Sequence, residues 1–286
     1  MLYMRTETRS LTSIDDLLDL ELAKRELGVF GVENIDFRWS TGSTNDDLKA
    51  QGRKQAFLQP KLLSVIEQTG GRGTRGRVWK CLGDALIFSI GLPLPAFATR
   101  SPGLISIAAG AGIVRHLRTR GLDAALKWPN DIWVNDGKSG GILSEVIRDA
   151  SGRSSVIVGI GLNLVLPAHL DAVTTSGWKM SALSSEPDAW STSTKRTLLL
   201  CGLVADVLIS LKNLEEYGIA DFCSRFSLID AFFGRRVFWK DDARGLLSEG
   251  IDNGIDTEGY LRVKTEDGEV LLGGGTSLVN AVGGRM

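Results

Sequence analysis

Histidine and cysteine are scarce in this chain of 286 residues, which has 2 histidines and 3 cysteines. The cysteines, Cys81, Cys201 and Cys223, are odd in number and form no Cys-x-x-Cys pair, which argues against a disulfide framework and against a structural zinc site. Because only His116 and His169 are available, no Ser-His-Asp or Cys-His arrangement is expected. The low cysteine content is typical of a reducing compartment, so we expect a cytoplasmic location.

Excess charge and long apolar runs are also lacking. The formal net charge is −1, so attraction to phosphate must come from local clusters of basic residues, whereas a nucleic-acid-binding protein is usually more basic. The N-terminal segment has no apolar core of signal-peptide type, and no segment approaches the ~18 apolar residues of a membrane span. We therefore expect neither DNA nor a membrane as a partner.

Apolar periodicity and turn residues predict a chain of mixed helices and strands. Helices are expected at 13–27, from Ser43 to Gly52, at 101–121 with Ser101 as the cap, and at about 194–217. Strands are expected at 62–69, 84–92, 131–134, 140–147 and 154–164, the last three adjacent and antiparallel. From residue 233 onward, four short strands separated by turns predict a small separate barrel.

The stretch GGRGTRGRVWK at 70–80 matches two known glycine-rich patterns. Gly71, Gly73 and Gly76 have the spacing of a dinucleotide-binding fingerprint and of a protein-kinase phosphate loop. The first pattern requires a helix directly after the glycines, where a strand is expected, and the second requires HRD and DFG motifs, which the chain lacks. The P-loop pattern also fails, because Arg77 and Val78 stand where Lys and Ser or Thr are required.

What remains is a loop in which glycines alternate with Arg72, Arg75 and Arg77 and which ends at Trp79. Glycines let the backbone approach a ligand, guanidinium groups bind phosphate in a bidentate manner, and tryptophan offers a stacking face. This composition is typical of a loop that folds over a nucleotide. The alternative is a solvated basic hairpin with a surface tryptophan.

A second motif, LKWPNDIWVNDGKSGGILSEV, covers residues 126–146. Lys127 lies in a run that is otherwise apolar enough to be buried, and a buried lysine is costly unless it meets an anion. That anion is either a ligand or a nearby carboxylate such as Asp131 or Glu145.

Five segments together resemble the biotin protein ligases, the enzymes that attach biotin to biotin-dependent carboxylases. They occur in that family's order and cover about residues 36 to 280. The segments are STN at 43–45, EQTGGRGTRGRVW at 67–79, KWPNDIWVNDGKSGGIL at 127–143, GIGLNL at 159–164 and a C-terminal barrel that begins near FGRRV.

The resemblance implies an α+β fold. A mixed β-sheet with helices on one side, related to the lipoate ligases, would be followed by a small Src-homology-3-like β-barrel. The chain would then divide into a short N-terminal helical extension at 1–35, a biotin- and ATP-binding catalytic domain at 36–230 and the barrel domain at 231–286. Residues 1–35 are too few for the winged helix-turn-helix of bifunctional members, so a ligase without repressor function is expected.

The resemblance also implies a reaction in two steps. The biotin carboxylate attacks the α-phosphorus of ATP to give biotinyl-5′-adenylate and pyrophosphate, and a lysine of a biotin carboxyl carrier protein then attacks the mixed anhydride. No enzyme nucleophile is needed, so positioning and electrostatics would carry the catalysis. Mg²⁺ is expected with ATP, held largely by phosphates and water, and no protein ligand for the metal is predicted. A homodimer paired through the edge of the 154–164 strand is left open.

The matching positions imply the roles of individual residues. Lys127 and Arg72 would be catalytic, with Lys127 placed between the biotin carboxylate and the α-phosphate. The biotin site would comprise Ser43, Thr44, Asn45 and Gln68 at the ureido end, together with Gly71, Arg72, Gly73, Thr74, Lys127 and Gly141. The ATP site would comprise Arg75 and Arg77 at the phosphates, Trp79 at the adenine, and Asn130, Lys138 and Asn163.

This chain departs from the family at Thr74, where many members have an arginine. The neutral side chain removes one contact that would hold the loop over the adenylate, so faster loss of the intermediate is expected. Three alternatives stay open: a lipoate or octanoate ligase of the same superfamily, a non-catalytic biotin-binding regulator such as a DNA-binding sensor, and an interaction module. The KWPND and GRGxRGRxW motifs favour biotin.

Overall fold

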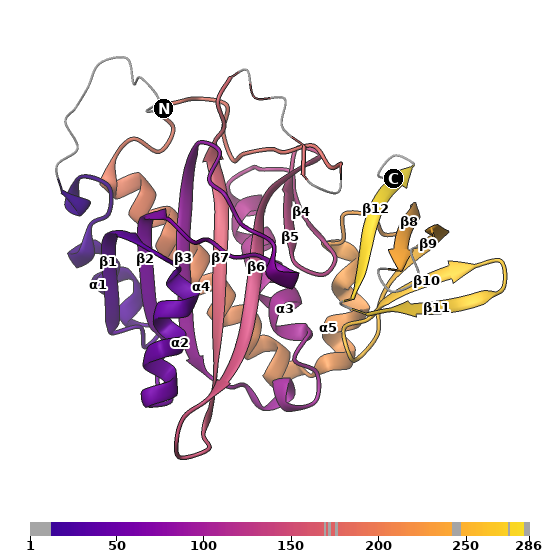
Figure 1. Ribbon diagram of the computed structural model, residues 1–286, viewed down its shortest axis with the longest axis horizontal. Helices are drawn as coiled ribbons and strands as arrows, with labels where there is room; N and C mark the ends of the chain where they lie inside the picture. The colour runs from indigo at the N-terminus through magenta and orange to yellow at the C-terminus, as the bar shows by residue number, and fades with distance from the viewer. Residues whose placement is uncertain are drawn as a thin grey trace.

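Seven strands form one mixed sheet in the N-terminal part of this computed structural model (Figure 1), which describes residues 13–168, 170, 173–174, 177–241, 247–273 and 275–282. The strands lie in the order β1-β2-β3-β7-β6-β5-β4, and only β1 and β2 are parallel. Their bounds are β1 Asn34–Thr41, β2 Lys61–Gln68, β3 Asp84–Pro93, β4 Ala124–Lys127, β5 Asp131–Val134, β6 Gly137–Arg148 and β7 Ser154–Val165. The expected α+β class and the antiparallel β5-β6-β7 arrangement are confirmed.

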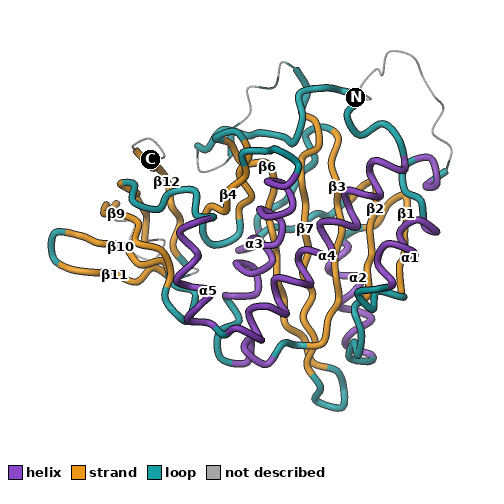
Figure 2. The backbone as a smooth tube through the Cα atoms, turned by 180° about the vertical axis from the view of Figure 1, so that it is seen from behind, coloured by secondary structure: helices purple, strands orange, loops and turns teal. Residues whose placement is uncertain are grey.

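Helices cover both faces of this sheet. They are α1 Leu20–Gly28, α2 Thr44–Lys54, α3 Leu104–Thr119, α4 Ser193–Tyr217 and α5 Ile219–Arg225. Figure 2 shows α3 and α4 across one face, where they share the large apolar core with α1. On the opposite face, Leu48 of α2 packs with strand residues such as Leu63 and Ile87 in a separate apolar cluster. The prediction that the helices lie on one side of the sheet is therefore wrong for α2.

Two helix starts differ from the sequence-based expectation. The prediction of a single helix at 13–27 is wrong. A 3₁₀ turn at Ile14–Asp16 comes first, and α1 begins after Asp19, whose carboxylate accepts a hydrogen bond from Leu22 N. Ser101 does not cap α3, since its hydroxyl donates to Thr257 O at 3.2 Å. The cap at Ser43 is confirmed, and α2 continues two residues beyond Gly52 to Lys54.

A second, antiparallel sheet follows in the C-terminal part, in the order β11-β10-β9-β8-β12. Its strands are β8 Arg236–Asp241, β9 Leu247–Ile255, β10 Leu261–Thr265, β11 Gly268–Leu272 and β12 Thr276–Val282. Four strands were expected here, so β12 is an addition, and the pairings among the described residues form no closed barrel. The predicted domain boundaries stay a prediction, because one apolar core includes residues of both sheets.

The long helix α4 passes the length and hydropathy test of a membrane span, with a mean hydropathy of 1.7 in its most apolar window. The expectation that no segment approaches this limit is therefore wrong. Half of that window is buried, and Arg196 of α4 pairs with Asp84 at 2.6 Å. His116 of α3 lies 3.0 Å from Asp206, a second polar contact of α4 within the fold.

The 154–164 strand, left open above as a dimer contact, lies inside the sheet. Strand β7 pairs with β3 on one side and with β6 on the other, along nearly its whole length. Both rows of its backbone groups are therefore used within the chain along most of the strand, so β7 has no free edge for a dimer contact.

The Arg196–Asp84 pair ties α4 to β3, and it generates a stability prediction. Arg196 is 2% exposed and also donates to Ala85 O, so Asp84→Ala leaves a buried guanidinium without its carboxylate. We expect the variant to lose about 3 kcal/mol of unfolding free energy, measured by urea denaturation. Lys212→Ala, which removes an exposed pair on the same helix, serves as the control, and an equal loss in both variants contradicts the prediction.

Candidate active site

A cavity of about 550 Å³, here called the main cavity, opens on the α2 face of the large sheet. The start of α2, the end of β2, the glycine-rich loop and strands β6 and β7 contribute to its walls. It brings together most of the predicted site residues: Ser43, Thr44, Asn45, Gln68, Arg72, Gly73, Thr74, Arg77, Trp79, Asn130, Lys138, Gly141 and Asn163. Arg75 and Lys127 do not line it, and neither does Gly71.

Two glycines of β7, Gly159 and Gly161, form the centre of the floor of the main cavity. A Cβ atom at Gly159 would lie 2.1 Å from Asn45 Oδ1, and a Cβ at Gly161 would lie 2.4 Å from the Trp79 ring. Both side chains therefore rest directly on the strand because these positions are glycine. The strand itself determines where Asn45 and Trp79 stand.

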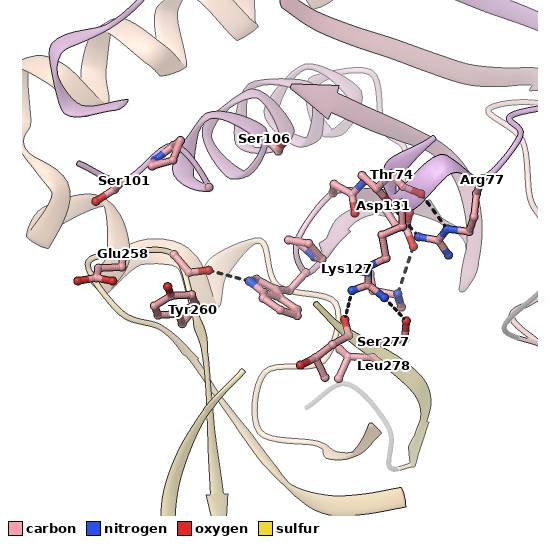
Figure 3. Close-up of a pocket in the computed structure, with 18 of the residues that line it drawn as sticks. Thr74, Arg77, Ser101, Ser106, Lys127, Asp131, Glu258, Tyr260, Ser277 and Leu278 are labelled. Atoms are coloured by element: carbon pink, nitrogen blue, oxygen red, sulfur yellow. Dashed lines mark hydrogen bonds and ion pairs between the residues drawn. The ribbon is translucent and has the colours of Figure 1, made fainter. Parts of the chain in front are cut away.

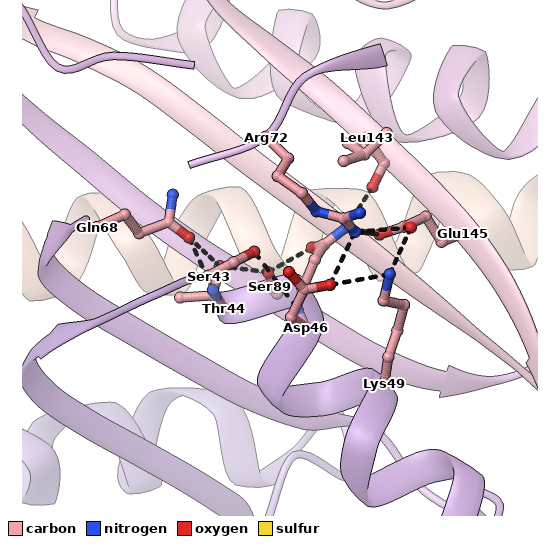
Figure 4. Close-up of polar contacts among 10 residues, drawn as sticks. Ser43, Thr44, Asp46, Lys49, Gln68, Arg72, Ser89, Leu143 and Glu145 are labelled. Atoms are coloured by element: carbon pink, nitrogen blue, oxygen red, sulfur yellow. Dashed lines mark hydrogen bonds and ion pairs between the residues drawn. The ribbon is translucent and has the colours of Figure 1, made fainter. Parts of the chain in front are cut away.

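One end of the main cavity is a network of neutral polar groups (Figure 4). The backbone N and the hydroxyl of Thr44 donate to Gln68 Oε1 at 2.7 and 3.0 Å, and Asn45 Nδ2 donates to Leu143 O at 3.2 Å. Ser89 Oγ lies 2.7 Å from both Thr44 Oγ1 and Asn45 Oδ1. Buried groups bonded in this way keep a fixed orientation, which suits recognition of a polar ligand. The role of Ser89 was missed, because a serine within an apolar strand carries no motif.

Arg72 is held beside this network by two carboxylates. Its guanidinium lies 2.8 Å from both oxygens of Glu145 and 2.9 Å from Asp46, and Lys49 pairs with the same two acids (Figure 4). Burial raises the pKa of Glu145, but hydrogen bonds from Lys49, Asn45 and Arg72 outweigh it and hold that pKa below the ordinary value. Arg72 thus fixes the base of the glycine-rich loop to β6.

The glycine-rich loop is a closed hairpin in this structure. Gly73 N donates to Arg77 O at 2.8 Å and Trp79 N donates to Gly71 O at 3.0 Å, with a 3₁₀ turn at Thr74–Gly76. A Cβ at Gly71 would lie 2.5 Å from Trp79 O, so this crossing requires glycine. The hairpin alternative describes the shape correctly, but Trp79 is half-buried on the sheet and is not a surface residue.

The other two arginines of the loop take different positions. Arg77 stays at the main cavity, where it donates to the backbone O and the hydroxyl of Thr74, and it forms no ion pair with any described residue. Arg75 points instead to β12, and donates to Ser277 Oγ at 2.6 Å and to Thr276 O at 2.7 Å. Arg75 lines the second cavity described below together with Arg77, and its role at the ATP phosphates stays a prediction.

Two lysines share one carboxylate at the other end of the main cavity. Lys127 Nζ is buried and lies 3.1 Å from Asp131 Oδ2, and Lys138 forms an ion pair with Asp131 Oδ1. The ammonium of Lys127 also lies 5.3 Å from the centre of the Trp178 ring. Of the two carboxylates considered as partners of Lys127, Asp131 is the one that lies within ion-pair distance.

Lys138 and Lys127 face different spaces. Lys138 lines the main cavity, whereas Lys127 lines a second cavity of about 290 Å³ that lies between the start of α3, the glycine-rich loop and the C-terminal sheet (Figure 3). Asp131, Asn130, Arg77 and Thr74 line both cavities and form the wall between them.

The pKa shifts at this wall follow from burial and charge. Burial is the largest effect at Lys127 and lowers its pKa, and the neighbouring Lys138 and Arg77 lower it further against the attraction of Asp131. Burial would raise the pKa of Asp131, but the charges and hydrogen bonds of Lys127 and Lys138 keep it below 3.8. Asp131 is therefore a carboxylate at neutral pH.

Two predicted ATP residues shape the walls through backbone contacts. Asn130 Nδ2 donates to Ile142 O at 2.8 Å, and Asn163 Nδ2 donates to Ser181 O at 3.0 Å.

Trp178 was not among the predicted site residues. Its ring packs edge-on against Trp133, with 5.2 Å between the ring centres, and its Nε1 donates to Leu278 O. The described residues contain no cluster of three or more metal-binding side chains.

Solved structures identify the class of this fold. Biotin protein ligase from Aquifex aeolicus in complex with biotin and ATP matches with a TM-score of 0.67 and 22% identity, covering 86% of this chain and 98% of that chain. Biotin acetyl coenzyme A carboxylase synthetase from Helicobacter pylori, with bound biotinylated ATP, matches with a TM-score of 0.53 and 23% identity, covering 83% of this chain and 99% of that chain. The architecture is that of the biotin protein ligases.

Sequence comparison finds relatives of the same kind. Residues 39–163 match the model of the biotin/lipoate A/B protein ligase family. The bifunctional ligase/repressor BirA of Escherichia coli is 30% identical over 219 residues, which are 75% of this chain and 65% of that protein. The biotin–[acetyl-CoA-carboxylase] ligase of Mycobacterium tuberculosis is 34% identical over 51% of this chain and 55% of its own length. The chain thus spans less than two thirds of either relative.

The charge of Asp131 gives a prediction about pH. Its pKa is depressed on folding, so its contribution to stability is complete above 3.8 and is lost as the pH falls through the lower folded-state value. We expect Asp131→Asn to lower the unfolding free energy by about 3 kcal/mol at pH 7, with a difference that shrinks below pH 3.8 in urea titrations. A difference that is independent of pH contradicts the assignment.

Proposed function

We propose that this protein is an ATP-dependent biotin protein ligase that forms biotinyl-5′-adenylate and transfers the biotinyl group to a lysine of a biotin carboxyl carrier protein. The main cavity carries this proposal, because it has a fixed polar network at one end and Lys138 with Arg77 at the other. An elongated ligand with a polar ring and a carboxylate matches both ends. A cytoplasmic location fits this activity.

Lys138 takes the role expected of Lys127 in this proposal. Lys138 lines the main cavity, so its ammonium can meet the biotin carboxylate and the α-phosphate, where negative charge gathers in the transition state. Lys127 lies behind Asp131 and acts through it, by holding the carboxylate that orients Lys138. Arg77 supplies a second cation at the phosphates.

The main cavity, as far as its residues are described, has too few carboxylates to hold a metal ion by itself. Asp131 is the single carboxylate among the described residues that line the main cavity, and it is already shared by two lysines. Mg²⁺ is therefore expected to arrive with ATP, held by phosphates and water. The carrier amine attacks the adenylate in the second step, and AMP leaves.

The first test is pyrophosphate release from ATP with biotin, with lipoate and with neither. We expect release that depends on biotin, a loss of about 100-fold or more in kcat for Lys138→Ala, and a smaller loss for Lys127→Ala, because Lys138 lines the main cavity and Lys127 does not. Lys212→Ala, on the exposed face of α4, is the matched control. If pyrophosphate is released with lipoate and not with biotin, the substrate belongs to the lipoate class. If neither biotin nor lipoate causes release, the protein is not such a ligase. A larger loss for Lys127→Ala returns the catalytic role to that residue.

Thr74 gives a second prediction about the intermediate. Its hydroxyl accepts from Arg77 at 2.9 Å, and it lines both cavities without adding charge. Thr74→Arg adds a cation over the adenylate, so we expect slower loss of biotinyl-5′-adenylate from the variant, by about tenfold for one charged hydrogen bond. The measurement is the dissociation rate of radiolabelled adenylate, and equal rates in the two proteins refute the expectation.

A further inference from the structure

Strand β12 contacts two segments that line the main cavity. Ser277 Oγ accepts a hydrogen bond from Arg75 Nη1 at 2.6 Å, and the backbone O of Thr276 accepts from Arg75 Nη2 at 2.7 Å. One residue further along, Leu278 O accepts from Trp178 Nε1 at 3.1 Å. The glycine-rich loop and the segment around Trp178 are therefore both bonded to residues 276–278, of which Figure 3 labels Ser277 and Leu278.

The position of Arg75 in its loop explains why this contact matters. Arg75 stands in the turn of the hairpin, at a φ of 60°, between the residues that close it, Gly73 and Arg77. The base of the hairpin is already fixed by Arg72, which binds Glu145 and Asp46. The tip has Arg75 as its anchor on the C-terminal sheet, some 200 positions away in sequence.

We propose that Ser277 is a positioning residue that holds the tip of the glycine-rich loop over the main cavity through Arg75. The proposal rests on the ligase function proposed above, because the loop then covers the adenylate. A neutral residue at position 74 gives the loop no cation of its own there, so the contact with β12 carries more of the closure. The C-terminal sheet thereby influences how long the intermediate is retained, although it contributes no reacting group.

Ser277 is suited to a clean test because its hydroxyl accepts a hydrogen bond from Arg75 directly. Ser277→Ala removes one charge-assisted hydrogen bond and leaves the backbone acceptor of Thr276 in place. The matched control is Ser248→Ala, which changes an exposed serine on β9 of the same sheet whose side chain forms no hydrogen bond with any described residue. Both substitutions are small and lie outside the apolar core, so both variants are expected to fold.

The structural readout is amide hydrogen exchange of the peptide that covers residues 70–80, measured on the full chain without ligand. We expect about three- to tenfold faster exchange in Ser277→Ala than in the unmodified chain and no change in Ser248→Ala, as for loss of one partly exposed bond to a charged group. Equal exchange in Ser277→Ala and the unmodified chain overturns the proposal.

The functional readout is the dissociation rate of biotinyl-5′-adenylate from the same three proteins. We expect a rise in Ser277→Ala of about the same factor as the rise in exchange, with an unchanged rate in the control. Faster exchange with an unchanged dissociation rate overturns the positioning role. Absence of biotin-dependent pyrophosphate release in the unmodified chain refutes the ligase function instead, and the exchange result alone then decides whether Ser277 holds the loop.

Discussion

The carboxylate of Asp131, shared by Lys127 and Lys138, is the interaction on which the site depends. Three consecutive strands supply these residues: β4 ends at Lys127, β5 begins at Asp131, and β6 carries Lys138. Without the carboxylate, two ammonium groups would face each other in a poorly hydrated space, which is costly. With it, one lysine is buried as a support and the other is directed into the main cavity. Asp131 lines both cavities, so its pairing with the two lysines lies in the wall that separates them.

The opposite end of the main cavity depends on missing side chains. Gly159 and Gly161 leave room on β7 for Asn45 and Trp79, and the bonded polar groups around Thr44 then have fixed positions. A sheet floor combined with a hairpin anchored at its base and at its tip holds the walls of the site in fixed positions. Such preorganisation suits a reaction without an enzyme nucleophile, in which position and charge do the catalytic work.

Sequence reasoning located the site but could not assign each residue within it. The STN, glycine-rich and KWPND segments do meet at one cavity, because their motifs encode local geometry. Lys127 and Lys138 belong to a single motif, and which of them faces the cavity depends on strand register, including a shift between Ile132 and Trp133. Arg75 is similar, since its partner on β12 is distant in sequence. Strand β4 was missed because four residues are too few for a periodic signal, and β12 was missed because its apolar residues do not alternate with polar ones.

The most direct test of the central claim is a crystal structure of the protein grown with biotin and ATP. The account predicts biotinyl-5′-adenylate in the main cavity, with its ureido ring at Thr44 and Gln68, and with its carbonyl and α-phosphate next to Lys138. Density for the ligand in the second cavity beside Lys127, or an empty main cavity at saturating concentrations of both substrates, would contradict it.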